Sequence, residues 1–124
     1  MWRILIVDDH ALVRRALATL IDGDGDMHVC GEVSTHAAGL EAIESLQPDL
    51  VITDLSFDAV QGLSLVGQIG RRHPGLPMLV VSLHDEAVYA ARALQAGARG
   101  YVEKHRMGDT LLAEIRLALG ITRH

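Results

Sequence analysis

Short apolar runs alternate five times along the chain with longer stretches whose apolar side chains recur at helical spacing. The apolar runs are residues 3–7, 27–33, 50–53, 78–82 and 99–102. Four of the longer stretches are residues 11–21, 62–72, 86–96 and 108–119. The fifth lies between the second and third apolar runs, is capped by Ser34 or Thr35 and ends at residue 46. Runs of strand length followed by helices are typical of repeated βα units. The pattern therefore predicts an α/β fold, with a loop at residues 54–61.

Strands as continuously apolar as these need cover on both faces, as in parallel sheets flanked by helices. Right-handed crossovers place such helices on the two sides of a twisted sheet. The prediction is a doubly wound, five-stranded parallel sheet with the common strand order 2-1-3-4-5, the (βα)5 flavodoxin-like arrangement. In this order the winding reverses between the first and third strands, and ligands bind there, outside the carboxyl ends of the strands.

Acidic side chains end the two strands that flank this reversal. Asp8 and Asp9 follow residues 3–7, and Asp54 follows residues 50–53. Lys104, the only lysine of the chain, follows the last predicted strand. Carboxylates about 5 Å apart repel each other by roughly 3 kcal/mol per pair at an effective dielectric of about 20, so three of them require a cation or protons. Three carboxylates and one ammonium at one edge indicate metal-assisted phosphoryl chemistry, with Mg²⁺ as the preferred ion.

Composition narrows the class of protein. The 124 residues fit one domain, residues 1–124, with 49% hydrophobic residues and a net charge of −5. No basic cluster is present, so this segment is not expected to bind nucleic acid directly. The apolar runs are much shorter than the roughly 20 residues needed to cross a bilayer, which predicts a cytoplasmic protein without a membrane span. Cys30, the single cysteine, is expected to be a small buried residue.

The residues at these strand ends resemble the receiver domains of two-component response regulators, over essentially the whole chain. Residues 6–10, Ile-Val-Asp-Asp-His, are similar to the acidic-pocket motif of that family. Asp54 matches the phosphoacceptor, Ser82 the switch hydroxyl, Tyr101 the switch aromatic residue and Lys104 the active-site lysine. Residues 82–85 and 96–101 are most similar to the subgroup whose regulators carry a C-terminal helix-turn-helix output domain.

The resemblance implies a phosphoacceptor module. Asp54 would attack the phosphorus of a phosphohistidine on a sensor histidine kinase and form an acyl phosphate. Asp9, Asp54 and the backbone carbonyl of Ser56 would hold Mg²⁺, and Asp8 would act mainly through a coordinated water. Lys104, Ser82 and backbone amides of the loop after Asp54 would bind the phosphoryl oxygens. Such a module is not a turnover enzyme, because its chemistry is limited to its own phosphorylation and slow acyl-phosphate hydrolysis.

The resemblance also implies a switch. Ser82 would move toward the phosphoryl group and vacate space into which Tyr101 turns, so that the surface of the last two helices and the last strand changes its protein contacts. Receivers of this kind can form homodimers when phosphorylated. DNA would be reached only through a C-terminal transcription-regulator domain that this chain does not contain.

One position departs from the family pattern, and it keeps an alternative open. Asp58 stands where the family loop usually has proline, which is compatible with a receiver-like domain that binds proteins without phosphate. A magnesium-dependent small-molecule phosphatase would need a second aspartate at the position of Ser56 and a cap domain, for which 124 residues leave no room. A flavin-binding module would have its phosphates repelled by Asp8 and Asp9.

Histidines add little to these expectations. The seven histidines include no pair at i, i+4 and have no cysteine companions, so a zinc site is not expected. His10 and His84 are expected near the phosphoryl site, where His84 could influence hydrolysis of the acyl phosphate.

Overall fold

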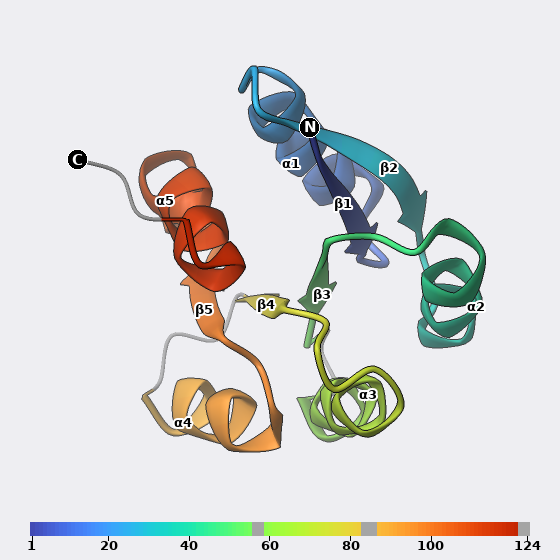
Figure 1. The fold of residues 1–124 in the computed structure, drawn as a ribbon. Helices are drawn as coiled ribbons and strands as arrows, with labels where there is room; N and C mark the ends of the chain where they lie inside the picture. The colour runs from blue at the N-terminus through green and yellow to red at the C-terminus, as the bar shows by residue number, and fades with distance from the viewer. Residues whose placement is uncertain (56–58, 83–86, 122–124) are drawn as a thin grey trace.

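A computed structural model describes residues 1–55, 59–82 and 87–121 (Figure 1). Strands and helices alternate along this part of the chain, as the apolar pattern predicts. The strands are β1 (Trp2–Val7), β2 (Met27–Val33), β3 (Leu50–Asp54), β4 (Met78–Ser82) and β5 (Gly100–Glu103). The helices are α1 (Ala11–Asp22), α2 (His36–Leu46), α3 (Ala59–Arg72), α4 (Ala87–Ala96) and α5 (Met107–Leu119), with a short 3₁₀ turn, η1 (Lys104–Arg106), before α5.

The five strands form one parallel sheet in the order β2-β1-β3-β4-β5, which confirms the predicted topology. In Figure 1, α1 and α5 lie on one side of the sheet, and α2, α3 and α4 lie on the other. Side chains alternate between these two sides along β1. Ile4 and Ile6 join a core with α1 and α5, whereas Leu5 and Val7 join a core with the other three helices.

The central strands carry these two cores because they are buried on both faces. Every residue of β3 and β4 is buried. Burying a side chain of the size of Leu or Ile contributes about 1.5–3 kcal/mol relative to its exposure, so the sheet is held mainly by hydrophobic packing. The strand ends that carry the polar residues are therefore attached to the most constrained part of the molecule.

Helix α3 starts earlier than the sequence pattern indicates. Residues 59–61 belong to its first turn and not to a loop, so that part of the prediction was wrong. Gly62 lies inside the helix and packs on the backbone of Leu55, where an added Cβ would come within 2.5 Å of the Leu55 Cα. The glycine marks this close approach of helix and strand end rather than the beginning of the helix.

Other local signals agree with the structure, with two corrections. Thr35 caps α2 by accepting a hydrogen bond from the Ala38 amide at 3.1 Å. The last strand begins at Gly100 and ends at Glu103, one residue later than predicted. Cys30 is only partly buried, because β2 is an edge strand whose residues are mostly half-covered. In the described ranges, none of the helices combines the length and the apolar character that a membrane span requires.

Candidate functional site

The carboxyl ends of the central strands converge at one edge of the sheet. Val7 of β1 pairs with Thr53 of β3, so Asp8 and Asp54 each stand one residue beyond this pair. On the other side of β3, Asp54 pairs with Val81 of β4, the residue before Ser82. Lys104 follows β5 directly and begins the turn η1. The register of a parallel sheet therefore brings together residues that are up to 96 positions apart, from Asp8 to Lys104.

Lys104 forms the centre of this arrangement. Its Nζ lies 3.1 Å from Asp8 Oδ2 and 3.1 Å from Asp54 Oδ1. The side chains are almost fully covered, with exposed fractions of 5% for Lys104, 1% for Asp8 and 4% for Asp54. A buried charge without a partner costs several kcal/mol, so the ammonium offsets much of the cost of burying two carboxylates. The two acids and the lysine are thus held as one charged unit.

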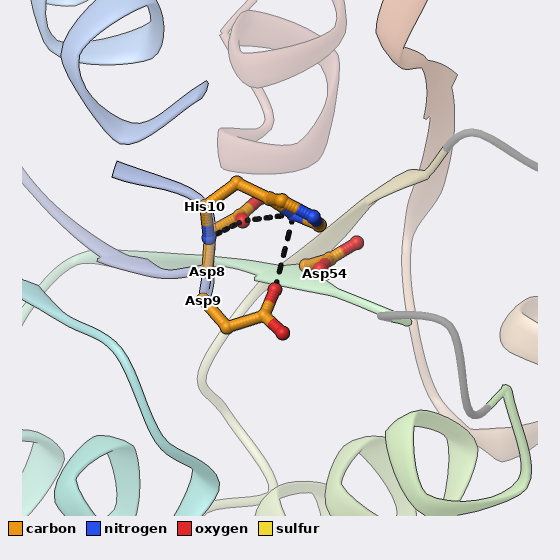
Figure 2. A group of neighbouring side chains, drawn as sticks. All are labelled: Asp8, Asp9, His10 and Asp54. Carbon is orange, nitrogen blue, oxygen red and sulfur yellow. Dashed lines mark hydrogen bonds and ion pairs between the residues drawn. The ribbon is translucent and has the colours of Figure 1, made fainter. Parts of the chain in front are cut away.

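Asp9 and His10 complete the site on its solvent side (Figure 2). The Asp9 side chain is 37% exposed, and the His10 ring is 48% exposed. The imidazole Nδ1 lies 3.1 Å from Asp9 Oδ1 and 3.3 Å from Asp8 Oδ1. The His10 backbone N–H donates to Asp8 Oδ1 at 2.8 Å, which is the local turn that aspartate side chains favour two residues before a donor.

Arg14, one turn into α1, contacts the same segment and was not singled out from the sequence. Its Nη1 donates to the backbone oxygen of Asp8 at 2.6 Å, and its Nε lies 3.8 Å from Glu32 Oε1 of β2. The Arg14 backbone N–H also donates to the carbonyl of His10 at 3.0 Å. The sequence signal for this role was a basic residue four positions after His10. That spacing places Arg14 in the first turn of α1, beside the carboxyl end of β1.

The two switch residues lie on neighbouring strands. Ser82 is fully buried at the end of β4, and its register partner in β5 is Glu103. Tyr101 pairs with Val80 and packs, half-buried, against the core formed with α2, α3 and α4. Ser56, whose carbonyl was expected to bind the metal, lies outside the described residues, as do Asp58, His84 and Asp85.

The donor set fits a divalent ion. In the described part of the chain, one ligand atom from each of Asp8, Asp9, His10 and Asp54 lies within 4.8 Å of the others. Three carboxylates and the Lys104 ammonium leave a formal charge of −2, which a divalent ion balances. Carboxylate oxygens are the ligands that hard cations such as Mg²⁺ prefer. Asp8, Asp9 and Asp54 would hold the ion, at the place where doubly wound sheets bind their ligands.

This fold and this edge define an acidic-pocket domain of the doubly wound α/β class. Comparison with known proteins identifies the family: residues 4–116 match the response regulator receiver domain, and the chain belongs to this family. It is 31% identical over 124 residues to the response regulator GacA of Pseudomonas viridiflava, covering 100% of this chain and 58% of that protein. The chain is thus a receiver domain of two-component response regulators, a family of regulatory modules rather than conventional enzymes.

Solved structures agree with this assignment. A two-component response regulator of the LuxR family from Aurantimonas sp. SI85-9A1 superposes with a TM-score of 0.90 at 28% identity, covering 97% of this chain and 86% of that one. The receiver domain of the response regulator NarL from Mycobacterium tuberculosis gives a TM-score of 0.84 at 28% identity, with coverages of 96% and 97%. The chain spans only about half the length of the curated regulators that it matches.

Proposed function

We propose that the domain accepts a phosphoryl group on Asp54, with Mg²⁺ bound at the acidic edge, and thereby changes a protein-contact surface. The observation that supports this most directly is the position of the Lys104 ammonium, 3.1 Å from both Asp8 and Asp54. Phosphoryl transfer needs little covalent help from a protein and depends on positioning and charge neutralisation. A buried ammonium beside a carboxylate at a divalent-ion site supplies both.

In the proposed reaction, a carboxylate oxygen of Asp54 attacks the phosphorus of a phosphohistidine. The new O–P bond forms as the P–N bond breaks, and the leaving imidazole takes a proton from solvent. Lys104 then exchanges its contact with the Asp54 oxygen for the oxygens of the incoming phosphoryl group, and Ser82 donates a hydrogen bond to them. Because these donors are held in a buried site, they need little reorganisation as charge develops.

Metal ligation in this proposal uses Asp9, Asp54 and the backbone carbonyl of Ser56, with Asp8 acting through a coordinated water. Bound Mg²⁺ would supply positive charge to the phosphoryl oxygens. Asp9 is well placed for this task because it is the most exposed of the three acids, with 37% of its side chain accessible, and an ion arriving from solvent meets it first. Slow hydrolysis of the acyl phosphate would return Asp54 to its free form.

The output is a change in protein contacts. Movement of Ser82 toward the phosphoryl group would let Tyr101 turn inward and would alter the surface formed by α4, β5 and α5. A sensor histidine kinase is the proposed donor, with homodimerisation on phosphorylation and a C-terminal DNA-binding domain as the proposed readouts. The length difference from the matched regulators supports a further domain, and the proposed location is the cytoplasm.

The proposal is tested by incubating residues 1–124 with a small acyl-phosphate donor and Mg²⁺ and measuring the intact mass. We expect the mass of one phosphoryl group on the wild type, and none on Asp54→Asn or after chelation of the metal. Absence of added mass on the wild type would favour the phosphate-independent alternative. Continuous release of inorganic phosphate from a small phosphomonoester would instead favour the phosphatase alternative.

A further inference from the structure

The His10 ring is arranged like a ligand of the ion that the proposed function requires. Its Nδ1 lies 3.1 Å from Asp9 Oδ1 and 3.3 Å from Asp8 Oδ1 (Figure 2). In an octahedral complex with bonds of about 2.1 Å, adjacent ligand atoms are about 3.0 Å apart and opposite ones about 4.2 Å apart. The His10 nitrogen therefore already lies at about the spacing of an adjacent ligand from Asp9 Oδ1, with Asp8 Oδ1 slightly farther away.

The fourth group completes the set. An Asp54 oxygen lies within 4.8 Å of the other three ligand atoms, so a movement of at most about 2 Å closes the cluster around an ion of this size. The ring side of the cluster is open to solvent, because the His10 side chain is 48% exposed. An ion can thus reach the imidazole without any rearrangement of the core.

We propose that His10 is a metal-ligating residue of this site, and that through it the pocket binds divalent transition ions such as Co²⁺ or Mn²⁺ by one nitrogen and the carboxylates. The inference rests on the metal site of the proposed function and goes beyond it in naming the ion class. Imidazole nitrogen suits transition ions, whereas Mg²⁺ prefers oxygen ligands, so His10 raises affinity selectively.

The backbone prepares His10 for this role. Its N–H donates to Asp8 Oδ1 at 2.8 Å, and its carbonyl accepts from the Arg14 backbone N–H at 3.0 Å. Arg14 also fixes the Asp8 carbonyl through its guanidinium, at 2.6 Å. With the backbone held at both ends, only the ring torsions of His10 remain to be ordered on binding, which lowers the entropy lost when the ion is bound.

The test compares the wild type with His10→Asn, and with His73→Asn as a matched control. His73 also lies beside a carboxylate, 3.4 Å from Glu44, but outside the acidic cluster. Affinities for Co²⁺ and for Mg²⁺ are measured by calorimetry at one fixed pH, because metals compete with protons for these ligands. We expect His10→Asn to lower Co²⁺ affinity about tenfold or more and to change Mg²⁺ affinity less than about twofold. His73→Asn should change neither.

A second measurement does not depend on the folding of a variant. Pulsed electron paramagnetic resonance of Mn²⁺ bound to the wild type should show coupling to one imidazole nitrogen. Absence of this coupling, or equal Co²⁺ affinity in wild type and His10→Asn, would reduce His10 to a counter-ion of the two aspartates and overturn the inference.

The mass assay for Asp54 phosphorylation with Mg²⁺, run on the same samples, separates the two claims. Phosphorylation that persists while Co²⁺ binding is independent of His10 would overturn only the inference. Nitrogen coupling in a wild type that never gains phosphoryl mass would support the ligand assignment and overturn the proposed function.

Discussion

The ammonium nitrogen of Lys104 lies 3.1 Å from Asp54 Oδ1, in a pair whose side chains are 5% and 4% exposed. The same nitrogen contacts Asp8 at an equal distance. Three segments that are distant in the sequence therefore share one buried cation. In the proposed reaction this contact has to be exchanged, since the Asp54 oxygen that becomes bonded to phosphorus no longer carries the charge that Lys104 neutralises.

Replacement of Lys104 by methionine keeps most of the side-chain volume and removes the charge. Two buried carboxylates then lose their partner, and we expect a loss of about 3 kcal/mol or more in the free energy of unfolding without metal. Phosphorylation by a small acyl-phosphate donor should slow about a hundredfold, since one preorganised charge is lost. Mg²⁺ affinity should rise, because the ion no longer competes with the ammonium. Urea unfolding, timed intact-mass spectra and calorimetry measure the three effects.

Lys104→Arg is the control for this prediction. It retains the positive charge but replaces a compact ammonium by a planar fork, so Mg²⁺ affinity should stay closer to that of the wild type. Phosphorylation of Lys104→Met at the wild-type rate would show that the ammonium takes no part in the reaction.

Asp9→Asn separates metal binding from folding. Its side chain is 37% exposed, so without metal the change in stability should stay within about 0.5 kcal/mol. Ligand binding to the folded state alone stabilises by about 2.7 kcal/mol at a hundredfold excess over Kd. At one fixed Mg²⁺ concentration, the stabilisation of Asp9→Asn should be smaller than that of the wild type in paired urea titrations. Glu41→Gln removes an exposed charge on α2 and should keep the full stabilisation by Mg²⁺. Equal stabilisation of Asp9→Asn and Glu41→Gln by Mg²⁺ would exclude Asp9 as a ligand.

Two glycines of α3 should respond in opposite ways to alanine. A Cβ at Gly62 would come within 2.5 Å of the Leu55 Cα and 2.7 Å of its carbonyl oxygen, which are backbone atoms that cannot step aside. Gly62→Ala should lower stability by about 1–3 kcal/mol, and it should also slow phosphorylation because Leu55 follows Asp54 directly. At Gly67 the nearest atom is the flexible end of Arg71, 3.3 Å away, so Gly67→Ala should stabilise the helix by up to about 1 kcal/mol. Thermal unfolding of both variants measures these changes in stability. A Gly62→Ala variant as stable as the wild type would contradict the packing argument.

Burial raises the pKa of the Cys30 thiol, with Asp49 adding to the shift and Arg3 opposing it. The folded protein should therefore react more slowly with a thiol reagent at pH 8 than the urea-unfolded chain, because only the thiolate is the nucleophile. A folded pKa above the unfolded one means that stability declines as pH rises through the thiol range. Cys30→Ser should remove this part of the alkaline decline, and equal declines in both proteins would refute the assignment.

Much of the fold could be predicted from local patterns. Continuous apolar runs specified the parallel strands, and the helical stripes between them specified the alternation. The strand order was taken from the common doubly wound arrangement, and the structure has that order. The placement of Asp8 and Asp54 at one edge followed from that order, since parallel strands end on the same side. The start of α3 was missed because Gly62 is explained by a contact with Leu55, which is absent from any local window.

The sequence by itself determined which elements form and which strand ends carry charge, because burial on one or both faces is encoded in side-chain spacing. Only the tertiary structure decided that Lys104 lies between two particular acids, that the His10 ring turns onto Asp8 and Asp9, and that Arg14 holds the Asp8 carbonyl. Such distances depend on how separately formed elements pack and on which rotamers that packing permits.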